Sequence, residues 1–164
     1  MIVSRIISIL MLSASAAYAS DLESWGEASG WNILVDPATG NGCLMEKTLE
    51  DNTLVQIGAM PNRQGGFLGV YNSAWDDIED GAQGVIRMDF GDALFEGVVE
   101  GKVFNGIPGG FAFFDNPNFV DEFAKRTRLI VTGKKSGHRV EIDLTGTTRG
   151  LAAVRACQKE QPTN

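Results

Sequence analysis

A single histidine limits the acid–base chemistry available to this chain. His138 is the only imidazole among the 164 residues, so any histidine-dependent catalysis must use it. On a strand, His138 lies on the same face as Val140 and Ile142. This predicts that its ring lies at the end of an inward-facing row, near a hairpin rim. The sequence has no Gly-x-Ser-x-Gly nucleophile elbow beside it. We therefore assign no catalytic residue and interpret His138 as a rim or surface residue.

Four acidic residues cluster beside Trp75 and resemble a calcium loop at first sight. In an EF-hand loop starting at the first of them, the third position is Ile78 and the twelfth is Arg87, so two carboxylate ligands are missing. We expect a solvated acidic turn, with no metal and no other cofactor. The alternative is a hydrolase of envelope polymers that uses carboxylates such as Asp76, Asp77 or Glu79. The whole run comprises Asp76, Asp77, Glu79 and Asp80.

Charge is distributed unevenly along the chain. Between Asp76 and Glu100 the sole basic residue is Arg87, whereas residues 125–139 contain no acid. One interpretation is that both stretches are solvated faces of one domain that partly oppose each other. The other is a docking patch, centred on the turn at 133–137, for an acidic envelope protein or an anionic glycan. The candidate patch residues are Lys125, Arg126, Arg128, Lys134, Lys135 and Arg139.

The stretch 104–114 combines a Gly/Pro turn with four phenylalanines. Strand alternation predicts Phe111 and Phe113 on one face and Phe114 on the other. Core packing is the first interpretation, because a small β domain needs large apolar side chains inside. If one face stays exposed, these three residues form a candidate apolar surface for a ligand or a partner.

The elements expected to position these residues are short strands joined by turns. Alternation and turn residues predict strands over 31–36, 43–45, 53–60, 67–71, 85–90, 93–104, 127–132 and 138–144. Asn116-Pro117 is a helix start signal, and a second short helix is expected from about Thr148. The order of the strands is that of a meander. We predict an all-β, mainly antiparallel single domain, a sandwich or partly open barrel of about eight to ten strands with two short helices.

The N-terminus is typical of a secretory signal peptide. Arg5 supplies a positive charge, residues 6–12 a short apolar core, and Ala17-Tyr18-Ala19 the small residues of a cleavage site. The apolar run is shorter than the roughly 20 residues that a membrane helix needs. We expect cleavage near Ala19 and a periplasmic or secreted location. The predicted organisation is a signal peptide over 1–19, a polar lead-in with little structure over 20–30, one β-rich domain over 31–158 and a tail over 159–164.

Cys43 and Cys157 are the only two cysteines and lie near opposite ends of the chain. In an exported protein such a pair predicts a disulfide, which would stabilise the fold by about 4–5 kcal/mol in the chain-entropy model. Two cysteines and one distant histidine do not supply a recognisable zinc spacing. The formal net charge of −7 argues against nucleic acid as a partner.

Several short patterns together resemble small uncharacterised exported proteins of alphaproteobacteria and, more distantly, the invasion-associated locus B family. The resemblance implies a periplasmic location, a β fold and a terminal disulfide, and it brings no catalytic residues. The patterns are Trp31-x-Ile33, Gly42-Cys43, Asn72-x-x-Trp75 followed by Gly81, Asp89-Phe90, and a closing Leu144-x-Gly-Thr with Leu151-Ala152 and Cys157.

The missing catalytic constellation and the uneven charge favour a non-enzymatic periplasmic binding or interaction protein of unknown ligand. The alternatives are the hydrolase described above and a structural protein of the envelope. The sequence indicates neither the ligand nor the oligomeric state.

Overall fold

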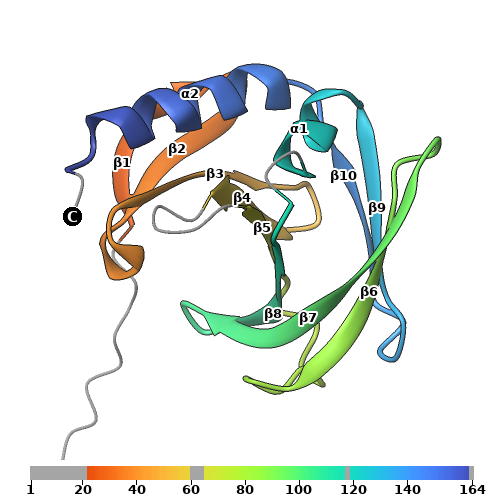
Figure 1. The fold of residues 1–164 in the computed structure, drawn as a ribbon. Helices are drawn as coiled ribbons and strands as arrows, with labels where there is room; N and C mark the ends of the chain where they lie inside the picture. The colour runs from red at the N-terminus through yellow and green to blue at the C-terminus, as the bar shows by residue number, and fades with distance from the viewer. Residues whose placement is uncertain (1–21, 60–64, 117–118, 163–164) are drawn as a thin grey trace, which may run out of the picture.

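The structure is a computed structural model that describes residues 22–59, 65–116 and 119–162. The predicted signal peptide lies outside the described residues. The described chain forms an all-β, mainly antiparallel domain with two helices, as the sequence predicts (Figure 1). The ten strands are β1 (Glu23–Ala28), β2 (Trp31–Asp36), β3 (Gly42–Thr48), β4 (Leu54–Ala59), β5 (Gly66–Tyr71), β6 (Gln83–Asp89), β7 (Leu94–Phe104), β8 (Ile107–Phe114), β9 (Arg128–Gly133) and β10 (Arg139–Asp143).

All ten strands belong to one antiparallel sheet, which curves strongly and does not close into a barrel (Figure 1). The strand order is β1-β2-β3-β4-β5-β8-β7-β6-β9-β10. The prediction of a simple meander is therefore wrong after β5, because β8 and not β6 pairs with it. Strand patterns in a sequence mark each strand but do not show its partner. Here the connection at 72–82 crosses the positions that β8 and β7 occupy in the sheet, and β6 begins on the far side of them.

The sheet begins earlier than the sequence predicts. Residues Glu23–Ala28 form β1 and pair with β2, although we expected little structure over 20–30. Most side chains of this edge strand are exposed, so it lacks the apolar alternation that marks a half-buried strand. Trp25 Nε1 donates a hydrogen bond of 2.8 Å to Glu160 in the last helix. The folded domain thus starts before residue 31 and ends beyond 158.

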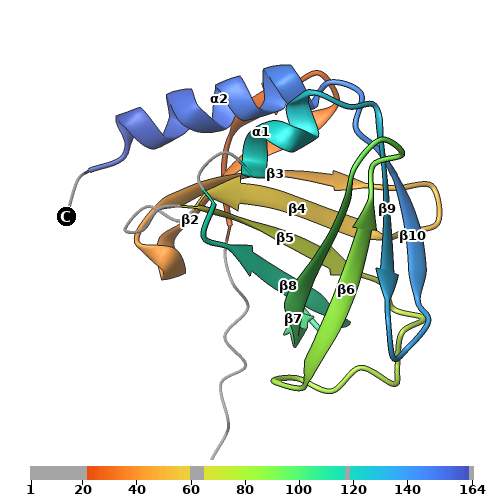
Figure 2. The same cartoon turned by 45° about the vertical axis from the view of Figure 1, so that its right-hand side comes forward.

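Two helices cover one end of the curved sheet, α1 (Phe119–Ala124) and α2 (Thr147–Glu160). Phe119 and Phe123 of α1 are buried, as their spacing predicts, and α2 buries Leu151 and Val154 against the sheet. The helices lie at one end of the sheet, whereas the β9–β10 hairpin and the β5–β6 connection lie at the other (Figure 2). Among the described residues, no helix is long and apolar enough to cross a membrane.

The predicted disulfide is confirmed, since Cys43 in β3 and Cys157 in α2 are bonded with their Cα atoms 6.1 Å apart. Both cysteines are fully buried. Cys43 N–H also donates to the side-chain oxygen of Gln158 at 2.9 Å. The last helix is therefore fixed to the sheet by a covalent bond and by hydrogen bonds.

Candidate functional site

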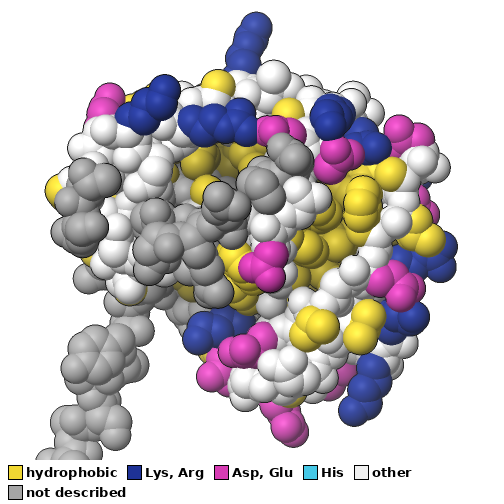
Figure 3. Space-filling model, in the orientation of Figure 1, with side chains coloured by type: hydrophobic (Ala, Val, Ile, Leu, Met, Phe, Trp, Pro, Cys, Tyr) yellow, Lys and Arg dark blue, Asp and Glu magenta, His cyan; other side chains and the backbone are white. Residues whose placement is uncertain are grey.

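A cavity of about 400 Å³ opens on the concave side of the sheet, at the end away from the helices. Its volume is toward the small end of the roughly 300–1,000 Å³ typical of small-molecule sites. In the space-filling view, hydrophobic side chains gather in the hollow between β8 and β9 (Figure 3). The apolar wall of the cavity is made by Val70, Ile86, Val99, Val131 and Val140.

Two glycines determine how deeply Val99 sits in the wall. An added Cβ at Gly84 of β6 would lie 3.2 Å from Val99 Cγ1, and one at Gly110 of β8 would lie 2.7 Å from Cγ2. The Val99 side chain therefore packs directly against the backbone of two neighbouring strands. A side chain at either glycine position would displace Val99.

The connection between β5 and β6 forms one side of the cavity mouth and is anchored by Asn72. The Asn72 side chain is buried and donates to Thr53 Oγ1 at 2.7 Å, while its Oδ1 accepts from the Ala74 N–H at 2.8 Å. Its own N–H donates to the Pro108 carbonyl at 2.9 Å. These bonds tie the first turn of the connection to Thr53, just before β4, and to β8, and Trp75 N–H donates to the Asn72 carbonyl at 3.0 Å.

The end of the same connection is held against β7 at Gly101. Gly81 N–H donates to the Gly101 carbonyl and Gly101 N–H donates to the Ala82 carbonyl, each at 2.7 Å. A Cβ at position 101 would lie 2.1 Å from the Glu79 carbonyl oxygen. Only glycine allows this close approach of the two backbones. The connection therefore crosses the end of the sheet as a fixed strap.

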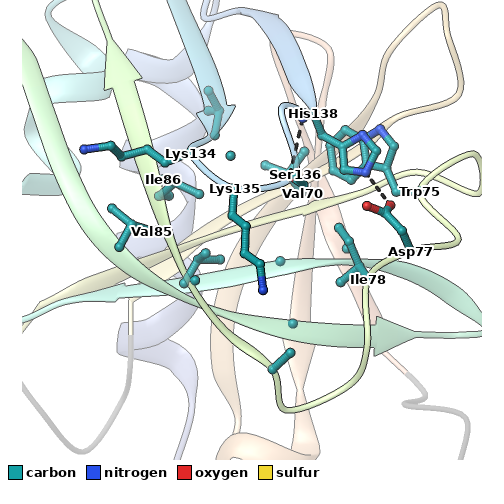
Figure 4. Close-up of a pocket in the computed structure, with 18 of the residues that line it drawn as sticks. Val70, Trp75, Asp77, Ile78, Val85, Ile86, Lys134, Lys135, Ser136 and His138 are labelled. Atoms are coloured by element: carbon teal, nitrogen blue, oxygen red, sulfur yellow. Dashed lines mark hydrogen bonds and ion pairs between the residues drawn. The ribbon is translucent and has the colours of Figure 1, made fainter.

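Three side chains from the two loops meet at the cavity mouth (Figure 4). The rings of Trp75 and His138 stack with centroids 5.1 Å apart and planes 17° apart. His138 Nε2 lies 2.5 Å from Asp77 Oδ1, and the Asp77 side chain is 56% exposed. The hydrogen bond from the His138 ring lowers the pKa of the Asp77 carboxyl below its usual value. This contact joins the strap to the β9–β10 hairpin.

Two adjacent lysines on the β9–β10 hairpin differ in their partners. Lys134 Nζ lies 3.1 Å from Glu96 Oε1 on β7. Lys135 also lines the cavity, and it forms no ion pair with any residue that the structure describes. The two side chains diverge in the close-up, and Lys135 extends between Val85 and Ile78 in that view (Figure 4). Within the described part of the chain, Lys135 is thus a cation at the mouth without a carboxylate partner.

Four of the six basic residues proposed as a docking patch flank β9, with Lys125 and Arg126 before its first residue and Lys134 and Lys135 after its last, about 20 Å apart. Arg128 and Arg139 are linked to each other, since both contact Glu141 of β10, at 3.4 and 3.5 Å. Arg126 contacts Asp92 at 2.6 Å and also Glu122, and Lys125 also pairs with Glu122. The Arg126–Asp92, Lys134–Glu96 and His138–Asp77 contacts join the basic stretch to the acidic stretch, so the two partly oppose each other, whereas Glu122 and Glu141 lie outside the acidic stretch.

The three phenylalanines proposed as an apolar surface lie on two faces of β8 and are all half-buried. Phe111 stacks on Phe67 with centroids 5.1 Å apart, on the face that it shares with Phe113. Phe114 points to the opposite face and stacks on Phe119 of α1 at 3.9 Å. The three side chains therefore do not form one continuous surface.

The acidic run is exposed, with Asp77 bonded to His138 as described above. Over residues 22–59, 65–116 and 119–162, no group of three or more histidine, cysteine, aspartate or glutamate side chains is arranged to hold a metal ion. The cysteines are joined in the disulfide. The part of the chain that the structure describes therefore offers the cavity, and not a metal centre, as its candidate site.

Comparison with protein-family models, with curated proteins and with solved structures finds no match to this chain. The family resemblance of the sequence therefore stays a prediction. The site must be interpreted from its own geometry.

Sequence reasoning placed Asp77 beside Trp75 but did not connect either of them to His138, which lies 61 residues beyond Asp77. The parity of His138 did place its ring on the inward row at the hairpin rim, where it lies. The signal for its partners was the Asn72-x-x-Trp75 pattern, since Asn72 anchors the loop that presents them. The cavity itself has no sequence signal, because it depends on pairing between β5 and β8.

Proposed function

We propose that the protein is an exported, non-enzymatic binding protein that takes a small, mainly apolar ligand into the cavity. The observation that carries the proposal is the cavity itself, an apolar recess of about 400 Å³ with a charged mouth. Concave apolar sites with a few polar groups at the entrance are the usual form of small-molecule sites. The glycines beside Val99 and the strap across Gly101 support a recess that is built into the fold.

The test is binding of a neutral apolar dye, N-phenyl-1-naphthylamine, followed by its fluorescence. Because Val99 already packs against Gly84 and Gly110, the ring of Val99→Phe would have to enter the recess, and we expect it to abolish dye binding. The control is Val98→Phe, the same change at the adjacent position, whose side chain is 64% exposed on the opposite face of β7. Equal binding by the two variants, with thermal unfolding showing both to be folded, would refute the proposal.

Export is supported by the N-terminal pattern and by the buried disulfide. It is tested by intact-mass analysis of the protein recovered from the periplasm or the medium. We expect a chain that begins near Ser20 and has no free thiol. An intact leader or two free thiols would contradict export.

The contact between Asp77 and His138 favours a second candidate, a hydrolase that uses this pair for general acid–base catalysis. Ser136 Oγ accepts the His138 backbone N–H at 3.3 Å, and no hydroxyl in the described ranges bonds to the imidazole ring. A water would then have to be the nucleophile. Turnover of peptidoglycan or polysaccharides that is lost in His138→Gln would establish this function over the first.

A further inference from the structure

We infer that the ligand of the cavity is an amphipathic monoanion, with its apolar part on the valine wall and its anionic group on Lys135. The inference rests on the proposed function and specifies the chemistry of its ligand. It starts from the arrangement at the mouth, where Lys135, which has no ion-pair partner among residues 22–59, 65–116 and 119–162, lies beside a recess with apolar walls.

The walls define the apolar part of the ligand. Val70, Ile86 and Val140 belong to the buried core of the domain, and all three line the cavity. A ligand chain placed against them would bury apolar surface, which is the main source of affinity in such sites. These three side chains carry no charge, so the charged end of a ligand is not favoured against them.

The ion pairs that the mouth residues already make define the charged part of the ligand. Lys134 is paired with Glu96, and the Asp77 carboxylate is bonded to the His138 ring. Glu79 also lines the cavity, and its backbone carbonyl is the part that packs over Gly101. Lys135 is the lining cation for which the described residues supply no carboxylate. An anionic headgroup would supply the missing partner without displacing an existing pair.

Trp75 and His138 border the same opening and form a flat stacked surface. An apolar chain that leaves the recess toward Lys135 would cross near this surface. Because the pair is fixed by the Asp77 contact and by the Asn72 anchor, the mouth is already ordered without ligand. The site therefore favours a ligand with its charge at one end.

The experiment compares three probes with the same tail, decanoate, decanol and decyltrimethylammonium, in displacement of the bound dye below their micelle concentrations. We expect the wild-type protein to bind in the order decanoate, decanol, decyltrimethylammonium. Lys135→Gln should reduce the preference for decanoate over decanol by about fivefold, equivalent to the ~1 kcal/mol of a favourable exposed ion pair. Lys159→Gln is the matched control, because it removes the same charge from an exposed position on α2 at the helix-covered end, and it should leave the preference unchanged.

The outcomes separate the inference from the function on which it rests. If decanol binds and Lys135→Gln leaves the decanoate preference unchanged, the inference is wrong and the cavity still binds apolar ligands. A preference for decyltrimethylammonium, or equal losses in both lysine variants, also overturns it. If the dye and all three probes fail to bind the folded protein, the proposed function itself is wrong.

Discussion

The helix-covered end and the open end of the curved sheet are built from different kinds of residue. At the helix-covered end, Trp31, Met45, Leu151 and Val154 are at most 3% exposed, and the disulfide joins β3 to α2. At the open end, glycines lie among the apolar residues of the wall, and the side chains at the mouth are partly exposed, with Lys134 paired to Glu96 and His138 to Asp77.

This difference assigns different physical roles to the two ends. Close packing of large apolar side chains supplies most of the stability of a small domain. Exposed ion pairs and glycine-lined walls contribute little stability but leave a recess with a charged entrance. Substitutions at the covered end should therefore change stability more than binding, and substitutions at the open end should do the reverse.

Removal of the disulfide tests this division with the largest expected effect. Cys43→Ala with Cys157→Ala opens a bond between residues 114 apart in sequence, and should lower the free energy of unfolding by about 2–5 kcal/mol. The measurement is urea unfolding of the double variant and of the wild-type protein. At temperatures where the variant is folded, dye binding should be unchanged. Loss of dye binding by folded protein would show that the two ends are coupled.

A single core substitution should have the next largest effect. Leu151→Ala removes a side chain that is 1% exposed between α2 and the sheet, and should cost about 2–5 kcal/mol. The matched control is Leu94→Ala, the same change at a side chain that is 52% exposed, which should cost about 0.5 kcal/mol or less. Thermal unfolding checks both. Equal losses would contradict the assignment of the core to the helix-covered end.

The two ends also differ in how far the sequence predicts them. The disulfide, the buried spacing of Phe119 and Phe123, and the inward row that ends at His138 follow from local patterns. The cavity does not, because its walls come from β5, β8, β7 and β6, whose order differs from the order in the chain. β1 was missed because an exposed edge strand carries no apolar alternation. The ion pairs depend on which segments the topology brings together, which composition does not specify.

Loss of the Asn72 anchor should affect the open end more than the covered end. Asn72→Ala removes the bonds to Thr53 Oγ1 and to the Ala74 N–H, at an expected cost of about 1–3 kcal/mol. The strap would then hold Trp75 less firmly against His138, so dye affinity should fall as well. The control is Ser73→Ala, at the next and exposed position. An unchanged affinity in Asn72→Ala would show that the strap does not shape the recess.

The smallest expected effect on stability comes from the contact between Asp77 and His138 at the cavity mouth. The pH dependence of this contribution distinguishes it from apolar packing. The pKa of Asp77 is lowered from its usual 3.8 by the hydrogen bond from His138, so the ionised carboxylate favours the folded state. This contribution is fully present above pH 3.8 and is lost as the pH falls through the lower folded value. Urea midpoints of wild type and Asp77→Asn should therefore differ near neutral pH and converge in acid. The control is Asp76→Asn, the same change at the neighbouring residue. If the urea midpoint of the wild-type protein stays as far above that of Asp77→Asn in acid, or moves further above it, the Asp77 carboxylate does not stabilise the mouth through its charge.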